Sequence, residues 1–250
     1  MKGQGTVADR EGALVGFGKG DYARPMRALP GRESRSSLAE PVASSRQSAA
    51  EEQRRRILLA TGELVAKRGY EAVTIALIVK RAHVSYKTFY KHFANKEECF
   101  LELFDRTVEA IRARIAARIA EIPDAAWPEQ VTLAIRTLFE TFLAEPLIAR
   151  AVVVEAPTVG PAIIERYQEA MNMLAPLLRR GRELSPEAAG LPPTLEVTLA
   201  GGVIWSAYQR LIVGEVDRIA TLLPESIEFV LRPYVGHEEA ARWAESAALG

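Results

Sequence analysis

The chain has 250 residues, of which 48% are hydrophobic and 26% are charged, and its formal net charge is zero. This balance is typical of a globular protein with a sizeable core and argues against a fibrous or largely disordered chain. The single cysteine, Cys99, excludes an internal disulfide, and no run of ~18 apolar residues is present to span a membrane. Because the first residues also lack the apolar core of a signal peptide, we expect a cytoplasmic protein without membrane contact.

The net charge of zero hides an uneven distribution. Residues 1–96 carry 18 Lys and Arg against 9 Asp and Glu, whereas residues 97–250 carry 14 against 23. A basic first third favours contact with a polyanion such as nucleic acid, and the acidic remainder indicates a separate task.

The first segment, residues 1–46, is rich in Gly, Pro, Ser and Arg and has no sustained periodicity, which predicts a disordered basic tail. Its arginines, together with the cluster Arg54–Arg56, could follow DNA phosphates and add affinity without sequence specificity. A solvated tail without that role is the simpler alternative.

Residues 47–96 are predicted to form a compact helical domain. Apolar residues recur at three- and four-residue steps from Ile57 to Val65, a helix that Gly69 would end. Thr74 would cap a second short helix, and Ser85 would cap a third after a tight turn.

Two short helices separated by a tight turn make a helix-turn-helix, which lays its second helix in the major groove of DNA. The apolar residues predicted to face inward are Ile75, Ile78, Val79, Val84, Phe89 and Phe93. The remaining side chains combine phosphate and base-edge donors with aromatic bodies. The residues predicted to contact DNA are Thr74, Ser85, Tyr86, Lys87, Thr88, Tyr90, Lys91, His92 and Lys96. Tyr86 and Lys87, at the N-terminal end of the helix, are placed for bases; a structural hairpin with a solvated lysine face is the alternative.

Residues 97–236 are predicted to be a second, all-helical domain. Asn95 would cap a long fourth helix, with Glu97 and Glu98 in its favoured first turn. Prolines punctuate the helices that follow, and Gly181 is the expected end of one of them. The segment 237–250 is expected to be a C-terminal tail. Since no alternating apolar pattern persists, we expect an all-α fold of about nine helices.

The stretch "GYEAVTIALIVKRAHVSYKTFYKHFANKEECF" resembles the N-terminal domain of the TetR family of transcriptional regulators (TetR/AcrR-type), and the resemblance covers about residues 54–103. It implies a homodimer with two DNA-binding heads and a C-terminal helical domain that holds a small ligand. Two positions depart from the family pattern. His83 stands where the family has a turn glycine, and Ala76 stands where some members have a base-reading arginine.

By this resemblance the second domain would hold a small, mainly apolar effector between its helices. The side chains expected to line the site are Phe104, Val108, Ile111, Phe142, Tyr167, Met171, Trp205 and Tyr208. Arg112, Arg136, Glu140 or Gln168 could orient the ligand. Most of the lining residues are equally explained as ordinary core.

Two stripes are predicted to form the dimer interface, as a four-helix bundle. They are Leu199, Gly202, Val203, Ser206 and Arg210 on one helix, and Ile227, Val230, Leu231 and Tyr234 on another. The alternative is that both stripes are buried within one subunit.

No sequence feature indicates an enzyme, a metal site or a cofactor. The three histidines have no metal-ligand spacing, and neither a nucleophile motif nor a phosphate-binding glycine loop occurs in a helical context. Cys99 is expected to be a packed residue rather than a redox sensor. The sequence therefore predicts a ligand-responsive, homodimeric DNA-binding regulator, most simply a repressor of an inverted-repeat operator. An activator, or a small-molecule-binding protein with a vestigial head, is the alternative.

Overall fold

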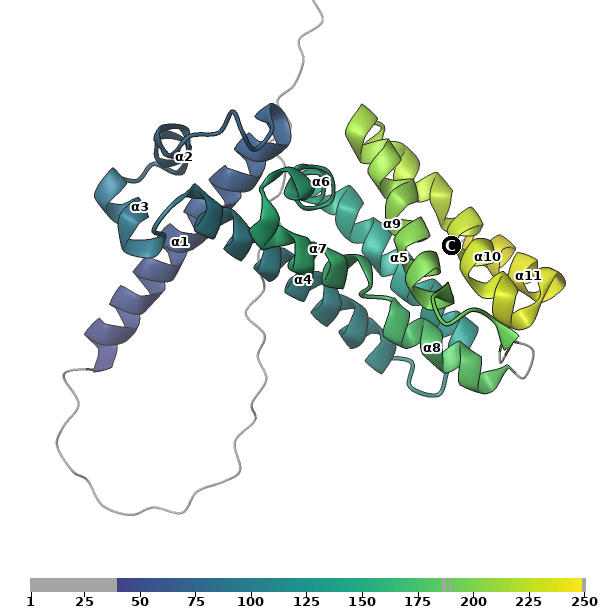
Figure 1. The fold of residues 1–250 in the computed structure, drawn as a ribbon. Helices are drawn as coiled ribbons and strands as arrows, with labels where there is room; N and C mark the ends of the chain where they lie inside the picture. Colours follow the sequence, from purple (N-terminus) through teal and green to yellow (C-terminus); the bar gives the residue numbers. More distant parts are fainter. Residues whose placement is uncertain (1–39, 186–187, 189, 249–250) are drawn as a thin grey trace, which may run out of the picture.

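The fold is known from a computed structural model, which describes residues 40–185, 188 and 190–248. Within these ranges the chain is entirely helices and connecting turns, with no strand (Figure 1). The all-α prediction is confirmed. Most of the predicted tail, residues 1–39, lies outside the described residues.

Three helices and the start of a fourth form an N-terminal head. They are α1 (Glu40–Arg68), α2 (Ile75–Ala82), α3 (Tyr86–His92) and α4 (Lys96–Ala120). The α1 helix ends at Gly69, whose φ of 78° only glycine adopts without strain. The prediction of a disordered segment is wrong for residues 40–46, because α1 already begins at Glu40. A glutamate and a proline in the first turn suit a helix start, a signal that the flanking low-complexity sequence obscured.

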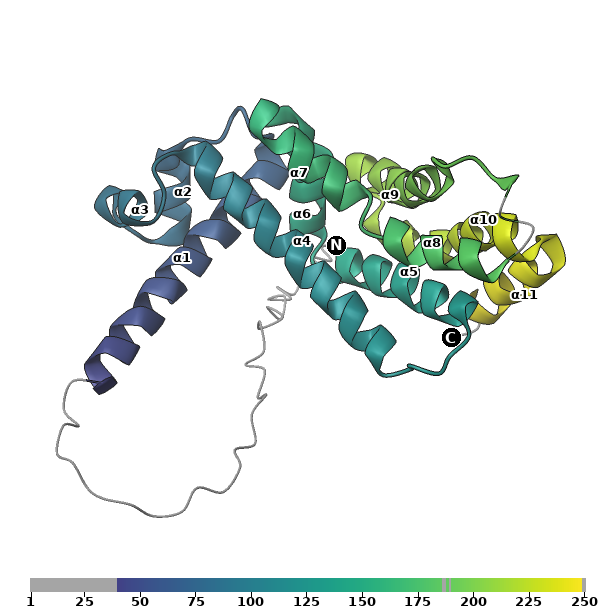
Figure 2. The ribbon, with the colours of Figure 1, turned by 60° about the horizontal axis from the view of Figure 1, so that its bottom comes forward.

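The body is a layered bundle that α4 joins to the head (Figure 2). Its helices are α5 (Trp127–Ala144), α6 (Pro146–Arg150), α7 (Pro161–Met171), α8 (Ala175–Leu184), α9 (Leu195–Val213), α10 (Leu223–Val235) and α11 (His237–Ala248). A π-helical turn, Ala151–Glu155, continues α6. Prolines open α5, α6, α7, α8 and α10, as their fixed φ and missing N–H favour.

Gly181 is not the end of a helix, contrary to expectation. It lies inside α8, and a Cβ there would come within 2.3 Å of the Trp127 ring. The glycine is required because α8 approaches Trp127 this closely, and the Trp127 indole N–H donates to the Leu177 carbonyl at 2.9 Å. The bond ties α5 to α8.

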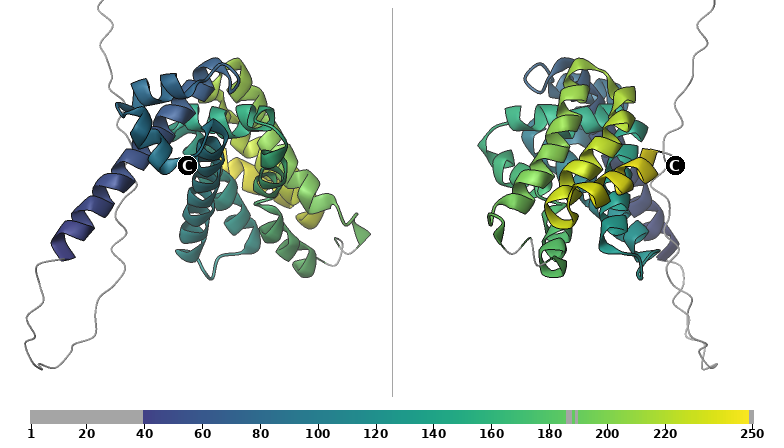
Figure 3. Two further views of the ribbon diagram at one scale, coloured as in Figure 1. Left: turned by 60° about the vertical axis from the view of Figure 1, so that its left-hand side comes forward. Right: turned by 90° about the vertical axis from the view of Figure 1, so that its right-hand side faces the viewer.

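The predicted C-terminal tail is also wrong. Residues 237–248 form α11, which packs along α10 and touches α5 (Figure 3). Its contact face is a stripe of small residues, Ala240, Ala244 and Ala247, and Arg136 donates to the Ala247 carbonyl at 3.2 Å. Alanine adds little to an apolar pattern, so the sequence signal for this helix was weak.

No helix among the described residues is long and apolar enough to cross a membrane.

Candidate nucleic-acid interface

Side-chain caps fix the start of both helices of the helix-turn-helix. The Thr74 hydroxyl accepts from the Leu77 amide at 3.3 Å, and the Ser85 hydroxyl accepts from the Thr88 amide at 3.1 Å. Each cap satisfies one of the amides that a helix start leaves without a partner. Between them His83 adopts the left-handed conformation, φ 53° and ψ 48°, as its place at the turn glycine position predicts.

The inward face packs as predicted. Ile78 and Val79 of α2 and Phe89 of α3 are buried, as is Phe93, whose ring centroid lies 5.7 Å from that of Phe89. Ile75 and Val84 are half-buried against the same cluster. These contacts hold α3 rigidly on the head, so its other face is left for a partner.

The outward face of α3 presents aromatic rings and ammonium groups to solvent. Tyr86 is 51% exposed and Tyr90 is 56% exposed, although large aromatic side chains are usually mostly buried. Lys87 and Lys91 are exposed beside them, and neither has an ion-pair partner among the described residues. This combination matches what contacts to phosphates and base edges require.

Three predicted DNA-binding residues are partly engaged within the protein. Thr88 is half-buried, with its hydroxyl 3.0 Å from that of Ser85. The Lys96 ammonium donates to the Tyr70 carbonyl at 2.9 Å and lies 3.9 Å from the Tyr70 ring centroid. His92 is half-buried; burial, with the nearby charges of Arg54 and Lys91, lowers its pKa. These residues shape the edge of the exposed face, and sequence spacing alone gave no sign of these surroundings.

Two of the three arginines in the basic cluster of α1 form ion pairs within the protein. Arg54 pairs with Glu102 of α4, and its guanidinium lies 5.1 Å from the Phe93 ring centroid. Arg55 pairs with Glu52 at 2.8 Å. The expectation that this cluster follows DNA phosphates is therefore not favoured for Arg54, which instead clamps α1 to α4. A carboxylate 48 residues along the chain could not be paired with it from sequence.

Cys99 is fully buried, and its Sγ lies 3.3 Å from the Thr61 hydroxyl. Burial raises the pKa of this thiol to about 12. The N-terminal end of α4 favours a thiolate, but burial removes water from the group and has the larger effect. The thiol therefore stays neutral and unreactive. This matches the packed role that the sequence favoured.

The predicted ligand-lining residues occupy the body, but they do not enclose a described cavity. Phe104, Val108, Ile111 and Phe142 are buried in the continuous core, and Tyr167, Met171 and Tyr208 pack against it. Trp205 is 58% exposed and stacks on Tyr208 with centroids 5.1 Å apart. Seven of the eight thus belong to the interior or its edge, whereas Trp205 belongs to the surface.

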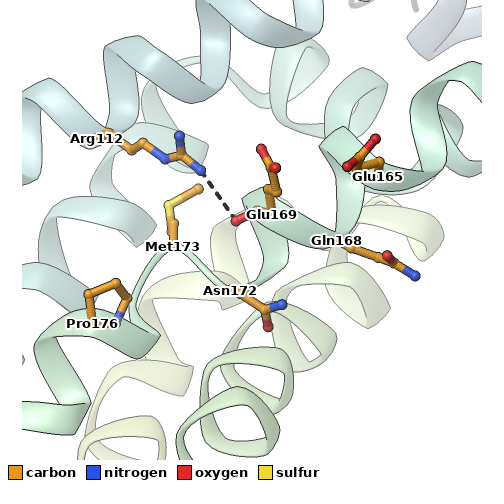
Figure 4. Close-up of a pocket in the computed structure, with 7 residues that line it drawn as sticks. All are labelled: Arg112, Glu165, Gln168, Glu169, Asn172, Met173 and Pro176. Atoms are coloured by element: carbon orange, nitrogen blue, oxygen red, sulfur yellow. Dashed lines mark hydrogen bonds between the residues drawn. The ribbon is translucent and has the colours of Figure 1, made fainter.

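An open depression of about 630 Å³ lies at the seam between α4 and the α7–α8 region. Figure 4 shows the residues around it, which are Arg112, Glu165, Gln168, Glu169, Asn172, Met173 and Pro176. Arg112 donates to the Glu169 carbonyl at 3.3 Å across the seam. Arg112 and Gln168 were two of the four residues considered for orienting a ligand; Arg136 and Glu140 do not line this depression.

The predicted dimer stripes are mostly internal. Leu199, Val203 and all four α10 residues (Ile227, Val230, Leu231 and Tyr234) are buried within the subunit, so the alternative holds for them. Gly202, Ser206 and Arg210 are half-buried. A different set of apolar side chains is exposed instead: Val197, Trp205, Ile212 and Val213 of α9 and Phe229 of α10. We call this set the α9–α10 face.

Comparison with known proteins identifies the head. The family described as "Bacterial regulatory proteins, tetR family" matches residues 57–103. The repressor KstR of Rhodococcus jostii is 38% identical over 78 residues, which are 31% of this chain and 36% of KstR. The activator FasR of Mycolicibacterium smegmatis is 28% identical over 130 residues, 46% of this chain and 58% of FasR. The chain thus spans about a third to just over half of the length of these relatives.

The fold of most of the chain is also shared with solved structures. FadR of Bacillus subtilis, solved with stearoyl-CoA, superposes with a TM-score of 0.62 at 22% identity, covering 72% of this chain and 97% of that one. A gamma-butyrolactone receptor described as ArpA-like gives a TM-score of 0.60 at 20% identity, covering 80% and 98%. Residues 57–103 therefore form a head of the kind found in the tetR family of bacterial regulatory proteins, and the described part of the chain shares its fold with these solved regulators.

Proposed function

We propose that this protein is a ligand-responsive, homodimeric transcriptional regulator that represses genes by binding an inverted-repeat operator. The observation that carries the proposal is the outward face of α3, where Tyr86, Lys87, Tyr90 and Lys91 stand exposed on a capped, rigidly packed helix. Tyr86 and Lys87 would meet base edges in the major groove. Thr74, Thr88, Tyr90, Lys91, His92 and Lys96 would lie along the phosphates.

The homodimer in this proposal forms through the α9–α10 face. Val197, Trp205 and Ile212 recur at steps of eight and seven residues, which places them on one side of α9. A monomer gains nothing from exposing several large apolar side chains together, and such a face is typical of an interface. Two heads related by a twofold axis would then read two half-sites of one operator.

The effector is a small, mainly apolar molecule held between α4 and α7, next to Phe104, Tyr167 and Met171. The ring centroids of Phe104 and Tyr167 lie 6.3 Å apart, and Met171 packs against the same hydrophobic core. A ligand entering there must move α7 away from α4 and would tilt α4, whose first turn carries the head. A 100-fold loss of DNA affinity requires about 2.7 kcal/mol of coupling between the two sites.

Selection of bound sequences from random DNA tests the proposal. We expect an inverted repeat, bound with a strong dependence on salt. Lys91→Ala should flatten the slope of log K against log salt by about 0.9 for each phosphate that the variant no longer neutralises. Lys87→Ala should instead relax the preference at one position of each half-site, weakening binding of the best sequence by about 1–3 kcal/mol.

Lys67→Ala is the matched control, because Lys67 is an exposed lysine of the head that lies in the last turn of α1 and not on α3. It should change neither the slope nor the sequence preference. Binding that ignores salt and is equally insensitive to all three substitutions would show a vestigial head and overturn the proposal.

The sign of regulation and the effector need their own measurements. FasR is named as an activator, so a reporter with and without the protein decides between repression and activation. Stearoyl-CoA and gamma-butyrolactones, named for two structures of this fold, are the first effectors to test. An effector at 100 times its Kd should raise the free energy of unfolding by about 2.7 kcal/mol and weaken operator binding.

A further inference from the structure

Arg150, the last residue of α6, links the head to the helix that carries the α9–α10 face. Its Nε donates to the Ala66 carbonyl of α1 at 3.0 Å. Its Nη1 donates to the carbonyls of Leu211 at 2.7 Å and Ile212 at 3.1 Å, both in α9. One side chain therefore holds three backbone oxygens from two helices that are far apart in the sequence. Figure 1 shows α6 between the end of α1 and α9.

The three oxygens explain why this position requires an arginine. They belong to the last turns of α1 and α9, where carbonyls lack the amide four residues on that would complete the helix, although the Leu211 carbonyl also accepts from the Gly214 amide at 3.3 Å. Two helix C-termini, each with partial negative charge, thus converge on one guanidinium. Only arginine offers a planar fork of donors that reaches several acceptors at once, and a lysine ammonium could not hold the same geometry.

Glu155 and the packing of α6 hold the guanidinium in place. The Glu155 carboxylate lies 3.4 Å from Arg150 Nη2, and only 13% of its side chain is exposed. On the other side, α6 presses against α1, since a Cβ at Gly62 would come within 2.6 Å of Ile148 Cδ1. Because α6 packs closely on α1 and its Arg150 also binds α9, we expect a shift of the α9 end to move the head as well.

We infer that Arg150 is a positioning residue that fixes the DNA-binding head relative to the α9–α10 face and so sets the separation of the two heads. Ile212, whose carbonyl Arg150 binds, and its neighbour Val213 are themselves exposed apolar residues of that face. Through Arg150, the end of α9 that would contact the partner subunit is linked directly to the last turn of α1. The inference rests on the proposed function, since it concerns how a homodimer matches its operator.

The test is the dependence of DNA affinity on half-site spacing, measured with duplexes built from the selected operator. Wild type should prefer the selected spacing over spacings changed by two base pairs. Arg150→Met should reduce that preference by about tenfold, because heads that are free to move fit wrong spacings better and the right one worse. Arg150→Lys should give an intermediate profile.

Arg182 provides a matched control. Its guanidinium also binds one carboxylate, Glu196, and three carbonyls, those of Ala188, Leu191 and Pro192, but all of these lie in the body. Arg182→Met should lower thermal stability as Arg150→Met does and leave the spacing profile unchanged. If Arg150→Met alone folds poorly, the double substitution Arg150→Met with Glu155→Gln removes the carboxylate left without a partner.

A second readout needs no DNA. A spin label at Glu71→Cys, an exposed position of the head, reports the head-to-head distance in the full-length dimer, and the buried Cys99 stays unlabelled. Arg150→Met should broaden the distance distribution, whereas Arg182→Met should not. Variants that fold and keep the wild-type spacing profile and distance distribution would overturn the role of Arg150. A wild type that neither dimerises nor selects an inverted repeat would instead overturn the proposed function.

Discussion

His83 closes the turn between α2 and α3 with a positive φ of 53°, and it is the one non-glycine residue of the described chain that does so. A Cβ in the left-handed region is strained by roughly 1 kcal/mol. The side chain is exposed, so packing against the head does little to offset this strain. The turn that orients α3 is therefore slightly strained, and a substitution at His83 can remove that strain.

Replacing His83 by glycine should stabilise the protein. We expect His83→Gly to raise the free energy of unfolding by up to about 1 kcal/mol in urea titrations, because the strain disappears. His83→Val should lower it, since a β-branched side chain fits this region worse. Ala113→Gly, at an exposed position within α4, is the control and should cost about 1 kcal/mol. Equal decreases for both glycine substitutions would show that the turn is not strained.

At the scale of elements, three helices of the body meet at one buried carboxylate. Glu196 of α9, only 3% exposed, accepts from Arg182 of α8 at 2.9 Å and from the Tyr234 hydroxyl of α10 at 3.2 Å. Burial acts to raise the pKa of Glu196, but the hydrogen bonds from Arg182, its own backbone and Tyr234 outweigh it and leave the pKa below the usual range. Glu196 therefore stabilises the fold as a carboxylate.

Glu196→Gln should destabilise the protein by about 3 kcal/mol at pH 7, because breaking a buried pair leaves the other charge uncompensated. The difference from wild type should be constant down to about pH 4.5, the ordinary pKa of the group. Below it the difference should shrink, because the unfolded state takes up a proton first and the folded carboxyl does so only at lower pH. Urea titrations between about pH 7 and pH 3.5 measure both effects. Glu183→Gln, exposed on α8, should show neither effect. A difference that grows on acidification would contradict a lowered pKa.

The elements that sequence predicted well are those with local signals. Thr74, Ser85 and Asn95 each cap the helix they were expected to cap, because a capping side chain and its amide lie within three residues. The failures have the opposite character. The helix α11 buries only alanines, packs along α10 and also touches the distant α5, and Gly181 is fixed by an indole from α5. Contacts between distant segments are invisible to a periodicity count.

The same limit applies to the candidate sites. The outward face of α3 followed from spacing alone, but the partners of Lys96 and Arg54 lie 26 and 48 residues away. On α9 the sequence favoured Leu199 and Val203, which face the subunit core. A helix with apolar residues on both sides does not reveal from its sequence which side the subunit buries and which it leaves for a partner.

For the whole molecule, the most exposed large aromatic side chain of the described residues is the Trp205 ring, at the middle of the α9–α10 face. Phe229 of α10 packs so closely on Gly202 of α9 that a Cβ at Gly202 would lie 2.8 Å from the Phe229 ring. Because of this close packing, α9 and α10 present one continuous surface. Buried tryptophans at the centre of an interface typically dominate its energy. A homodimer through this face should therefore depend on Trp205 more than on any charged residue around it.

Trp205→Glu should convert the dimer into a monomer at micromolar concentration, since a hot-spot cost of at least about 2 kcal/mol is joined by burial of two symmetry-related charges. Sedimentation equilibrium measures the change in dissociation constant. Ile164→Glu is the control, because Ile164 of α7 is 51% exposed and apolar but lies outside the face. Far-ultraviolet circular dichroism should be unchanged for both variants. If Ile164→Glu dissociates the dimer and Trp205→Glu does not, the subunits associate through α7, and α9 can no longer transmit partner contact to the head.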